Sequence, residues 1–440
     1  SATAAAPLRR ASLHTLGCRL NQTETALLRD RLTRAGYTIV PFGECADLAV
    51  INTCAVTRLA AAKCRKIIRQ FTTANPRAYT AVVGCYSQLG AKDLAAIPGV
   101  DLVLGNNDKL NLLEYIGNGT KNPNPIIVCE RISRRNFSIP FAGGSPFNKR
   151  ANIKVQDGCD FGCSFCAIPL ARGRARSRDF ANILDEAHSL ASRGVCELVI
   201  TGVNIGVYAA AGHSFTDVVD VLAEVPGISR IRIGSIEPAT VPEGIIERMA
   251  DPAHPLMPSL HVPLQSGCAR ILHDMRRHYT KEDYTTFVRE ALARVPGLCL
   301  GTDIMVGFPG ETDTEFAETC TFFEETPFAY AHVFTYSERE GASAARRADP
   351  VPVPIRQQRS VFLRRLSAAR HHEFLSAHVG RTLRVLFEDP GENYWPGLTE
   401  NYLRVRIPFS QTTGRDLTNQ TARVRTTFAH ANFLEASLLD

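Results

Sequence analysis

The chain has 440 residues, of which 45% are hydrophobic and 21% charged, and its formal net charge is +6. This length predicts more than one hydrophobic core, and the composition excludes a disordered or fibrous protein. No run approaches the ~18–20 uninterrupted apolar residues of a membrane span, and the N-terminus lacks the apolar core of a secretory signal. We therefore expect a cytoplasmic protein with no membrane partner, and the small positive excess is compatible with a polyanionic one.

The first predicted domain, residues 1–133, alternates short apolar runs with amphipathic helical stretches. This alternation is typical of an α/β fold with a doubly wound parallel sheet. The predicted strands are 12–16, 48–52, 79–83 and 102–104, and helices include 24–35 and 60–71.

A segment rich in Gly, Pro and Asn, 117–148, marks a boundary, and residues 134–375 form the second predicted domain. About six β/α units in this region predict a partial or complete β/α barrel. The predicted strands are 153–156, 198–201, 230–235, 260–262, 300–306 and 330–334, and helices include 180–192, 281–293 and 313–325.

An Arg-rich helix, about 355–377, leads into the third predicted domain, residues 376–440. Short strands separated by polar turns predict a small β-barrel there. The predicted strands are 381–387, 402–407 and 422–428.

Thirteen cysteines are more than a cytoplasmic protein of this size needs. Because disulfides are not expected in a reducing compartment, the count favours metal binding or catalysis. The segment NIKVQDGCDFGCSFC places three of them, Cys159, Cys163 and Cys166, in C-x-x-x-C-x-x-C spacing directly after the first strand of the predicted barrel. Active sites of β/α barrels lie at the carboxyl ends of strands, so position and chemistry agree.

Three thiolates at this spacing can hold one iron–sulfur cube and leave one iron without a protein ligand, as a catalytic cluster requires. A structural zinc site is the alternative reading. It would need a fourth ligand, which no nearby His or second C-x-x-C pair offers.

Three further cysteines each follow a predicted strand of the first domain, in the runs SLHTLGC, LAVINTC and YTAVVGC. Carboxyl ends of parallel strands share one edge of a sheet, so Cys18, Cys54 and Cys85 are expected to converge on one point. The other seven cysteines lack this register, and we interpret them as packing residues. They are Cys45, Cys64, Cys129, Cys196, Cys268, Cys299 and Cys320.

The motif C-x-x-x-C-x-aromatic-C after a first barrel strand resembles the radical S-adenosylmethionine (SAM) superfamily. There the open iron binds the amino and carboxylate groups of SAM, and an electron from the cluster releases a 5′-deoxyadenosyl radical. The wider pattern LGCRLNQTET, INTCAVT, VVGCYSQ and QDGCDFGCSFCAIPLARGRARSR resembles the methylthiotransferase family over nearly the whole chain. This resemblance implies two [4Fe–4S] clusters, one per cysteine triplet, with all six cysteines at the catalytic site.

Within that family, LGCRLNQTET and TGVNIGVY most resemble the MtaB-type branch. The branch adds a methylthio group to carbon 2 of N6-threonylcarbamoyladenosine next to the anticodon of tRNA, using two SAM. The resemblance implies a monomer that binds the tRNA anticodon stem-loop, an electron donor such as flavodoxin or ferredoxin, and a sulfur donor. Isopentenyladenosine in tRNA and a ribosomal protein are the alternative substrates, and an iron–sulfur RNA-binding sensor is the alternative outside enzymes.

Polar residues at other strand ends are candidates for SAM contacts, although each could instead be a helix N-cap. Glu237 and Asn204 suit the methionyl amino group, Ser235 its carboxylate and Asp303 the ribose. The full candidate set is Gly202, Asn204, Ser235, Glu237, Gln265 and Asp303.

Four alternating arginines follow the cluster motif, and an extended backbone would place them on one side as a ladder for tRNA phosphates. A solvated loop is the alternative. These residues are Arg172, Arg174, Arg176 and Arg178. The C-terminal tail resembles the TRAM module, an RNA-binding β-barrel, in which Tyr394 and Trp395 would add stacking contacts.

Overall fold

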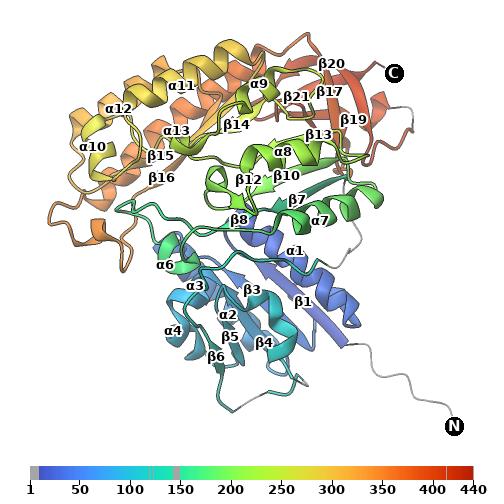
Figure 1. The fold of residues 1–440 in the computed structure, drawn as a ribbon, viewed down its shortest axis with the longest axis vertical. Helices are drawn as coiled ribbons and strands as arrows, with labels where there is room; N and C mark the ends of the chain where they lie inside the picture. Colours follow the sequence, from blue (N-terminus) through green and yellow to red (C-terminus); the bar gives the residue numbers. More distant parts are fainter. Residues whose placement is uncertain (1–8, 118, 122, 142–148, 413, 440) are drawn as a thin grey trace. The chain divides into compact units, whose positions relative to one another are not determined.

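The computed structural model describes residues 9–117, 119–121, 123–141, 149–412 and 414–439. The chain divides into two compact units (Figure 1). Unit 1 consists of Ser1–Ser145, Lys154–Glu186 and Ser337–Ala345, and unit 2 of Pro146–Ile153, Ala187–Tyr336 and Arg346–Asp440. The three-domain division at 133/134 and 375/376 stays a prediction, and residues 142–148 of the expected boundary segment lie outside the described residues.

Unit 1 contains a six-stranded sheet in the order β2-β1-β3-β4-β5-β6, and its strands pair in parallel. The order reverses between β1 and β3, which makes the carboxyl edge of these two strands the switch point where open α/β sheets bind ligands. The strands are β1 (Arg9–Thr15), β2 (Tyr37–Val40), β3 (Leu48–Thr53), β4 (Tyr79–Gly84), β5 (Leu102–Leu104) and β6 (Ile126–Val128).

Apolar side chains of this sheet alternate between two cores, as the two-residue period of a strand requires. In β3, Ala49 and Ile51 belong to one core and Leu48 and Val50 to the other. Helices α2 and α4 contribute to the first core and α1 and α5 to the second, so the predicted doubly wound sheet is confirmed. The helices are α1 (Arg19–Arg34), α2 (Arg58–Ala74), α3 (Cys85–Leu89), α4 (Ala91–Ala95), η1 (Lys109–Asn111) and α5 (Leu112–Tyr115).

The segment with the C-x-x-x-C-x-x-C motif belongs to unit 1 and is closed by a short antiparallel pair, β8 (Gln156–Asp157) with β9 (Arg176–Ser177). Helix α6 (Ile168–Arg172) lies between these strands in the chain. Gly158 has a φ of +72°, and a Cβ there would lie 2.7 Å from the carbonyl oxygen of Gly173. Only glycine therefore permits the approach of the two loop ends that brings β8 beside β9.

Unit 2 contains two three-stranded parallel sheets, β13-β10-β7 and β14-β15-β16, with helices between successive strands (Figure 1). This alternation confirms the predicted partial β/α barrel. Its strands are β7 (Arg150–Lys154), β10 (Glu197–Thr201), β13 (Arg230–Ile233), β14 (Ser259–His261), β15 (Cys299–Val306) and β16 (Tyr330–Thr335), with a hairpin of β11 (Ala209–Ala210) and β12 (His213–Ser214). The helices are η2 (Ile205–Val207), α8 (Phe215–Ala223), η3 (Pro238–Thr240), α9 (Ile245–Ala250), α10 (Ala269–Asp274), α11 (Lys281–Arg294), α12 (Asp313–Glu325) and α13 (Val353–Ser376). Helix α7 (Phe180–Ser192) begins in unit 1 and ends in unit 2, and η4 (Ser343–Arg346) belongs to unit 1 except for its last residue.

Capping residues explain where two of these helices begin. Thr280 and Asp283 form a capping box at the start of α11, and Thr312 and Glu315 form one at the start of α12. Each box satisfies backbone N–H groups that lack a partner in the first turn. Both helices therefore start where the sequence predicted them.

Helix α13 is the predicted Arg-rich helix, and two of its arginines serve the fold. Arg356 donates to the carbonyl of Tyr336 at 3.0 Å, and Arg359 donates to the Glu311 carboxylate at 2.6 Å. Both side chains are buried, so they do not extend a basic surface. Within the described ranges, no helix is long and apolar enough to cross a membrane.

The C-terminal strands form a closed barrel in the order β17-β18-β19-β21-β20, as predicted. Its core includes Trp395, whose Nε1 donates to the Thr412 hydroxyl at 3.3 Å, so the expectation that this ring stacks on RNA is wrong. Strand β18 was not predicted, because its Pro396-Gly397 pair resembles a turn. The elements are β17 (Thr382–Phe387), β18 (Tyr394–Thr399), β19 (Arg404–Pro408), η5 (Phe409–Gln411), β20 (Thr421–Ala429) and β21 (Leu434–Leu438).

Candidate metal centre and active site

Cys18, Cys54 and Cys85 lie at the carboxyl ends of β1, β3 and β4, which are neighbours in the sheet of unit 1. Cys54 directly follows β3, Cys85 begins α3 directly after β4, and Cys18 caps the N-terminus of α1. The strand register predicted from sequence therefore places the three thiols at one edge, at the switch point of the sheet.

Two glycines with positive φ allow this convergence. Gly17 has a φ of +105°, and a Cβ there would lie 2.8 Å from Cys54 Sγ. Gly84 has a φ of +102°, and a Cβ there would lie 2.7 Å from the carbonyl oxygen of Thr53. The backbone before Cys18 and before Cys85 thus packs directly against the loop that carries Cys54.

The thiols influence one another electrostatically. Burial, and then the charges of Cys85 and Cys18, raise the pKa of Cys54 to about 11, although a hydrogen bond from the N–H of Val56 to Cys54 Sγ opposes the rise. Crowded thiols resist ionisation unless a cation compensates them, and a bound iron supplies that compensation. The donor set therefore fits a metal cluster better than three independent thiols.

Asn21 connects the loops around these cysteines, and sequence reasoning missed it. Its Nδ2 donates to the carbonyls of Leu16 at 2.8 Å and Thr53 at 3.0 Å, and its Oδ1 lies 4.0 Å from Cys85 Sγ. The available signal was its place three residues after Cys18, which is about one helical turn further along α1.

Cys159, Cys163 and Cys166 lie on the loop between β8 and α6, and all three are partly exposed. The N–H of Phe161 points at Cys159 Sγ and the N–H of Ile168 at Cys166 Sγ, both at 3.4 Å. Each donor lies two residues beyond its cysteine, as the N–H of Val56 does for Cys54. Such N–H donors stabilise thiolates, and thiolates are the ligands that iron–sulfur clusters take.

The predicted one-sided arginine ladder is wrong. Arg172, Arg176 and Arg178 are buried, and only Arg174 is exposed. Arg172 ends α6, and the turn at Gly173, with a φ of +76°, interrupts the extended backbone that a ladder needs. The buried guanidinium groups are instead partners of carboxylates and amides, which are Asn21, Glu24, Asp157, Asn182 and Glu186.

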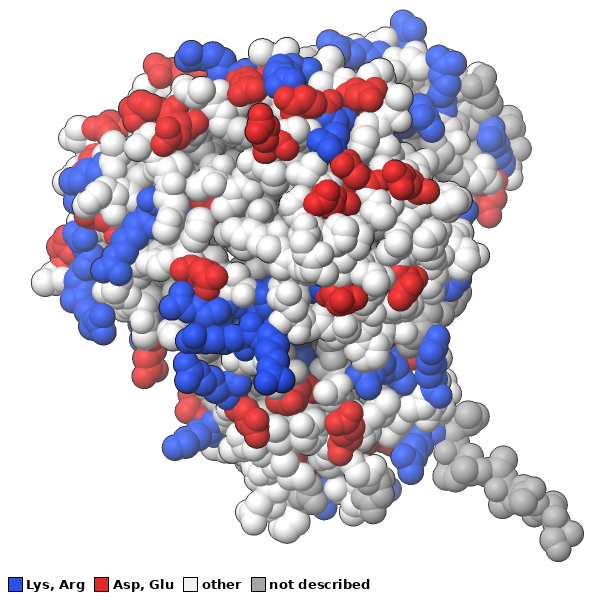
Figure 2. Space-filling view, viewed as in Figure 1, with Lys and Arg blue, Asp and Glu red and all other residues white. Residues whose placement is uncertain are grey.

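Exposed arginines occur on a neighbouring segment of unit 1. Arg131, Arg134 and Arg135 are exposed, and the chain that follows them lies beside β9, where Phe137 N–H donates to the Ser177 carbonyl at 3.1 Å. Figure 2 shows Lys and Arg side chains gathered over the region where Figure 1 draws α6. These arginines and Arg174 are exposed basic groups of unit 1 that a polyanion can reach.

The candidate SAM residues lie at or near strand ends of unit 2. Gly202 and Asn204 follow β10, Ser235 and Glu237 follow β13, and Gln265 follows β14. Glu237 forms an ion pair with Arg277, and Asn204 Oδ1 accepts from the Thr240 hydroxyl at 2.8 Å. Their roles toward SAM stay predictions.

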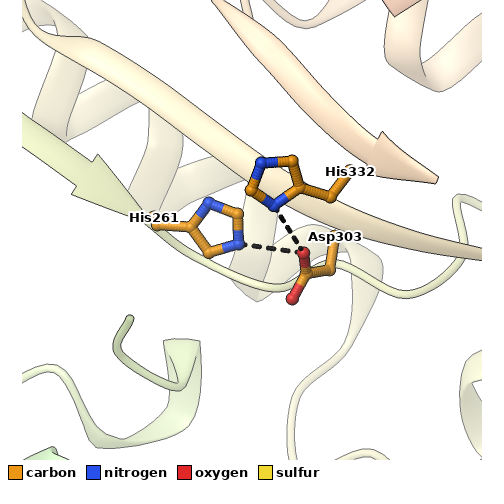
Figure 3. A group of neighbouring side chains, drawn as sticks. All are labelled: His261, Asp303 and His332. Atoms are coloured by element: carbon orange, nitrogen blue, oxygen red, sulfur yellow. Dashed lines mark ion pairs between the residues drawn. The ribbon is translucent and has the colours of Figure 1, made fainter. Parts of the chain in front are cut away.

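Asp303 lies inside β15 rather than at its end, and its carboxylate faces two imidazoles (Figure 3). Its Oδ1 is 3.0 Å from His261 Nε2 and 3.4 Å from His332 Nδ1. Asp303 and His332 are cross-strand partners, and His261 and His332 stack with ring centroids 5.0 Å apart. The three ligand atoms lie within 4.8 Å of one another, so the group has the donors for a metal ion as well as for its mutual hydrogen bonds.

Comparison with known proteins adds two family matches. Residues 10–105 match a family described as uncharacterized protein family UPF0004, and residues 153–323 match the radical SAM superfamily. The first match covers the six-stranded sheet up to β5, and the second covers the motif loop and most of the β/α barrel.

Curated relatives match over most of the chain. A threonylcarbamoyladenosine tRNA methylthiotransferase MtaB from Bacillus subtilis is 36% identical over 403 residues, which cover 90% of this chain and 89% of that protein. The protein of the same name from Aquifex aeolicus is 35% identical over 404 residues, which cover 90% of this chain and 96% of that protein.

A solved structure supports the fold. The radical SAM methyltransferase TsrM from Kitasatospora setae, with cobalamin and a [4Fe–4S] cluster bound, has a TM-score of 0.57 to this chain. The two are 16% identical, and the match covers 77% of each chain. At this identity the likeness concerns the fold alone.

Proposed function

Because this chain belongs to the MtaB-type threonylcarbamoyladenosine tRNA methylthiotransferases of the radical SAM superfamily, we propose that it adds a methylthio group to carbon 2 of N6-threonylcarbamoyladenosine next to the anticodon of tRNA. One observation carries the proposal. Two sets of three cysteines, one at the carboxyl edge of a sheet and one on a loop, each bring three thiols to one place in unit 1. Such sites leave one iron of a cube open for a reacting ligand.

We assign Cys159, Cys163 and Cys166 to the cluster that binds SAM, and Cys18, Cys54 and Cys85 to an auxiliary [4Fe–4S] cluster. When bound, SAM and the clusters supply a radical that abstracts hydrogen from an unactivated carbon, together with the methylthio group that replaces it. The residues of this chain hold, orient and shield these groups. Because an aromatic C–H has no acidic proton, the reaction needs no side chain of this protein as a general base.

The polar strand ends of unit 2 are proposed to bind SAM, with Glu237 and Asn204 at the amino group, Ser235 at the carboxylate and Asp303 at the ribose. Asp303 is suited to accept hydrogen bonds, because its pKa is held well below its usual range. Burial opposes that shift, and hydrogen bonds from His261 and His332 outweigh it. Gly202 and Gln265 complete the proposed pocket.

For tRNA we propose contacts by the exposed Arg174, Arg131, Arg134 and Arg135 in place of the buried arginines. Guanidinium groups bind phosphate with two parallel hydrogen bonds, and the phosphate backbone dominates nucleic-acid affinity. We infer a cytoplasmic monomer that acts on the anticodon stem-loop and is served by a sulfur donor and an electron donor such as flavodoxin or ferredoxin.

The decisive experiment is mass spectrometry of tRNA nucleosides from a strain that lacks this protein. We expect 2-methylthio-N6-threonylcarbamoyladenosine to disappear and its precursor to accumulate, and the wild-type gene, but not Cys54→Ser, to restore the product. An unchanged product would overturn the proposal. Loss of methylthio from isopentenyladenosine or from a ribosomal protein would select one of the alternative substrates, and failure to release 5′-deoxyadenosine anaerobically would favour a sensor.

A further inference from the structure

Unit 1 contains a group of charged side chains that are almost fully buried. Glu24 accepts from Lys154 at 2.9 Å and from Arg172 at 3.0 Å, and it also pairs with Lys109. Asp157 accepts from Lys154 at 2.7 Å and from Arg172 at 3.0 Å. The side chains of these five residues are at most 5% exposed.

The charges of this group do not balance. Three cations, Lys109, Lys154 and Arg172, face two carboxylates, Glu24 and Asp157. Arg176, 8% exposed and 3.5 Å from Asp157, adds a fourth cation. Uncompensated charge away from water is costly, so a buried cationic excess calls for a further anion nearby.

The pKa shifts of the buried groups agree with this count of charges. Burial opposes ionisation of Glu24, but Arg172, Lys109 and Lys154 outweigh it and hold its pKa well below the ordinary range. Burial lowers the pKa of Lys109, the Glu24 carboxylate opposes that shift, and repulsion from Arg172 and Lys154 adds to it. The carboxylates are thus fully ionised and still leave positive charge uncompensated.

Two amides connect the cationic excess to the sulfur of Cys85. Asn21 Oδ1 accepts from Arg172 at 2.7 Å and lies 4.0 Å from Cys85 Sγ. Asn106 Oδ1 accepts from Lys109 at 2.6 Å, which turns its Nδ2 toward Cys85 Sγ at 3.6 Å. Lys109 at Oδ1 and the Ala171 carbonyl, which accepts from Nδ2 at 2.6 Å, therefore fix the orientation in which Asn106 offers an N–H donor to the cysteine.

The anion that fits this place is a thiolate-bound cluster. Three thiolates give an iron–sulfur cube a net negative charge, which increases on reduction and on binding of a sulfide at the open iron. Nearby positive charge and N–H donors to sulfur favour the more negative state, and both are known determinants of cluster potential.

We propose that Lys109, Lys154 and Arg172, positioned by Glu24 and Asp157, form an electropositive support for the cluster on Cys18, Cys54 and Cys85. This support raises the reduction potential of that cluster and strengthens binding of an anionic sulfur ligand to its open iron. The inference rests on the proposed function, because it requires the auxiliary cluster. Lys109 and Arg172 are positioning residues, since they act through the cluster and the two amides.

The test uses full-length chain carrying Cys159→Ala, Cys163→Ala and Cys166→Ala, reconstituted anaerobically so that only the auxiliary cluster is present. Into this background we would introduce Lys109→Met, which leaves two cations for two carboxylates at the centre of the group. Electron paramagnetic resonance in a redox titration gives the midpoint potential, and titration with inorganic sulfide gives its dissociation constant.

We expect K109M to lower the midpoint potential by about 59 mV relative to the triple-cysteine variant alone. For a one-electron couple this is about a tenfold lower ratio of reduced to oxidised cluster at the midpoint of that variant. The sulfide dissociation constant should rise by a similar factor, and Lys109→Arg should restore both values. Lys121→Met is the matched control, because Lys121 pairs with Asp101 at 2.8 Å before the start of β5, at the opposite edge of the sheet. It removes the same charge and should leave both values unchanged.

Arg176→Met provides a second variant, which must shift both values in the same direction by less, because Arg176 lies 3.5 Å from Asp157, farther than Lys154 and Arg172 do. If K109M fails to bind a cluster, Arg176→Met alone tests the proposed electropositive support. A triple-cysteine variant that binds no cluster overturns the auxiliary site and this inference together. A bound cluster with equal potentials in K109M, R176M and K121M overturns the inference alone.

Discussion

Cys18, Cys54 and Cys85 come from three strands of one sheet, whereas Cys159, Cys163 and Cys166 come from a single loop between β8 and α6. In the sheet-edge triplet, Cys54 and Cys85 are buried, and the loops are held by glycines of positive φ and by Asn21. In the loop triplet every cysteine is partly exposed, and backbone N–H groups of the loop itself donate to Cys159 Sγ and Cys166 Sγ. The sheet-edge triplet therefore depends on correct folding of the whole sheet, whereas the loop triplet depends mainly on the conformation of one short segment.

The largest expected effect separates the two triplets by chemistry. Cys163→Ser should abolish both SAM cleavage and methylthiolation, whereas Cys54→Ser should abolish methylthiolation and keep SAM cleavage. Anaerobic assays of 5′-deoxyadenosine and of tRNA nucleosides measure the two activities. Cys64→Ser is the control, since Cys64 is a neighbouring cysteine outside both triplets whose Sγ lies 3.4 Å from the Cys54 nitrogen and 3.6 Å from the Cys54 carbonyl oxygen. Equal loss of 5′-deoxyadenosine in both variants would show that the triplets do not have separate roles.

The next effect tests the charge group that lies beside the sheet-edge triplet. Glu24→Gln leaves buried cations without their shared carboxylate and should cost about 3–5 kcal/mol in the free energy of unfolding at pH 7. The folded-state pKa of Glu24 is lowered, so its contribution is fully present above the unfolded carboxyl pKa of about 4.3 and is lost progressively as the pH falls from there through the folded-state pKa.

Chemical denaturation of wild type and E24Q between pH 7 and pH 3.5 measures this difference. The gap should be widest at neutral pH and narrow in acid. Glu243→Gln, at an exposed position of unit 2, is the control and should shift the unfolding midpoint little. A gap that does not change with pH would exclude an ionised Glu24 in the folded protein.

A smaller effect contrasts two glycines beside the triplets. Gly84→Ala combines a φ of +102° with a Cβ 2.7 Å from a backbone oxygen, and should destabilise unit 1 by about 2 kcal/mol. Gly162→Ala, in the loop triplet, meets no atom within 4 Å and should change stability by less than about 0.5 kcal/mol. Thermal unfolding and iron content of the two variants measure the contrast, and equal iron loss would contradict it.

The smallest effect concerns the arginines after the loop triplet. Arg174→Ala should weaken tRNA binding by about 1 kcal/mol, or fivefold, and reduce the dependence of affinity on salt by about one ion. Arg178→Ala should instead reduce stability, because Arg178 pairs with Glu186 and donates to Asn182. Filter binding at several salt concentrations, with unfolding measured in parallel, tests both. If correctly folded R178A lost more tRNA affinity than R174A, the predicted row of phosphate-binding arginines would be correct after all.

The sequence predicted well what depends on local pattern. Apolar runs that end in Gly-Cys or Thr-Cys placed Cys18, Cys54 and Cys85 at strand ends, because strand period and parallel topology follow from the pattern itself. The helices predicted at 281–293 and 313–325 likewise correspond to α11 and α12.

Prediction from the sequence failed where a side chain pairs with a residue far away along the chain. Arg172 pairs with Glu24, 148 residues away, and no periodicity reveals such a contact. Alternating arginines resemble a solvated face, yet burial of Glu24, Asp157 and Glu186 required their charges inside the fold. His332 was missed for a related reason, since only the register of β15 with β16 sets it beside Asp303.

Asn21 gives the sheet edge a mechanical property. One amide links the carbonyl before Cys54, the turn before Cys18 and the guanidinium of Arg172. Displacing any one of these segments therefore requires the amide to give up a hydrogen bond to it. Asn21 thus couples the place where the motif loop begins its return to the turns that carry two of the sheet-edge cysteines.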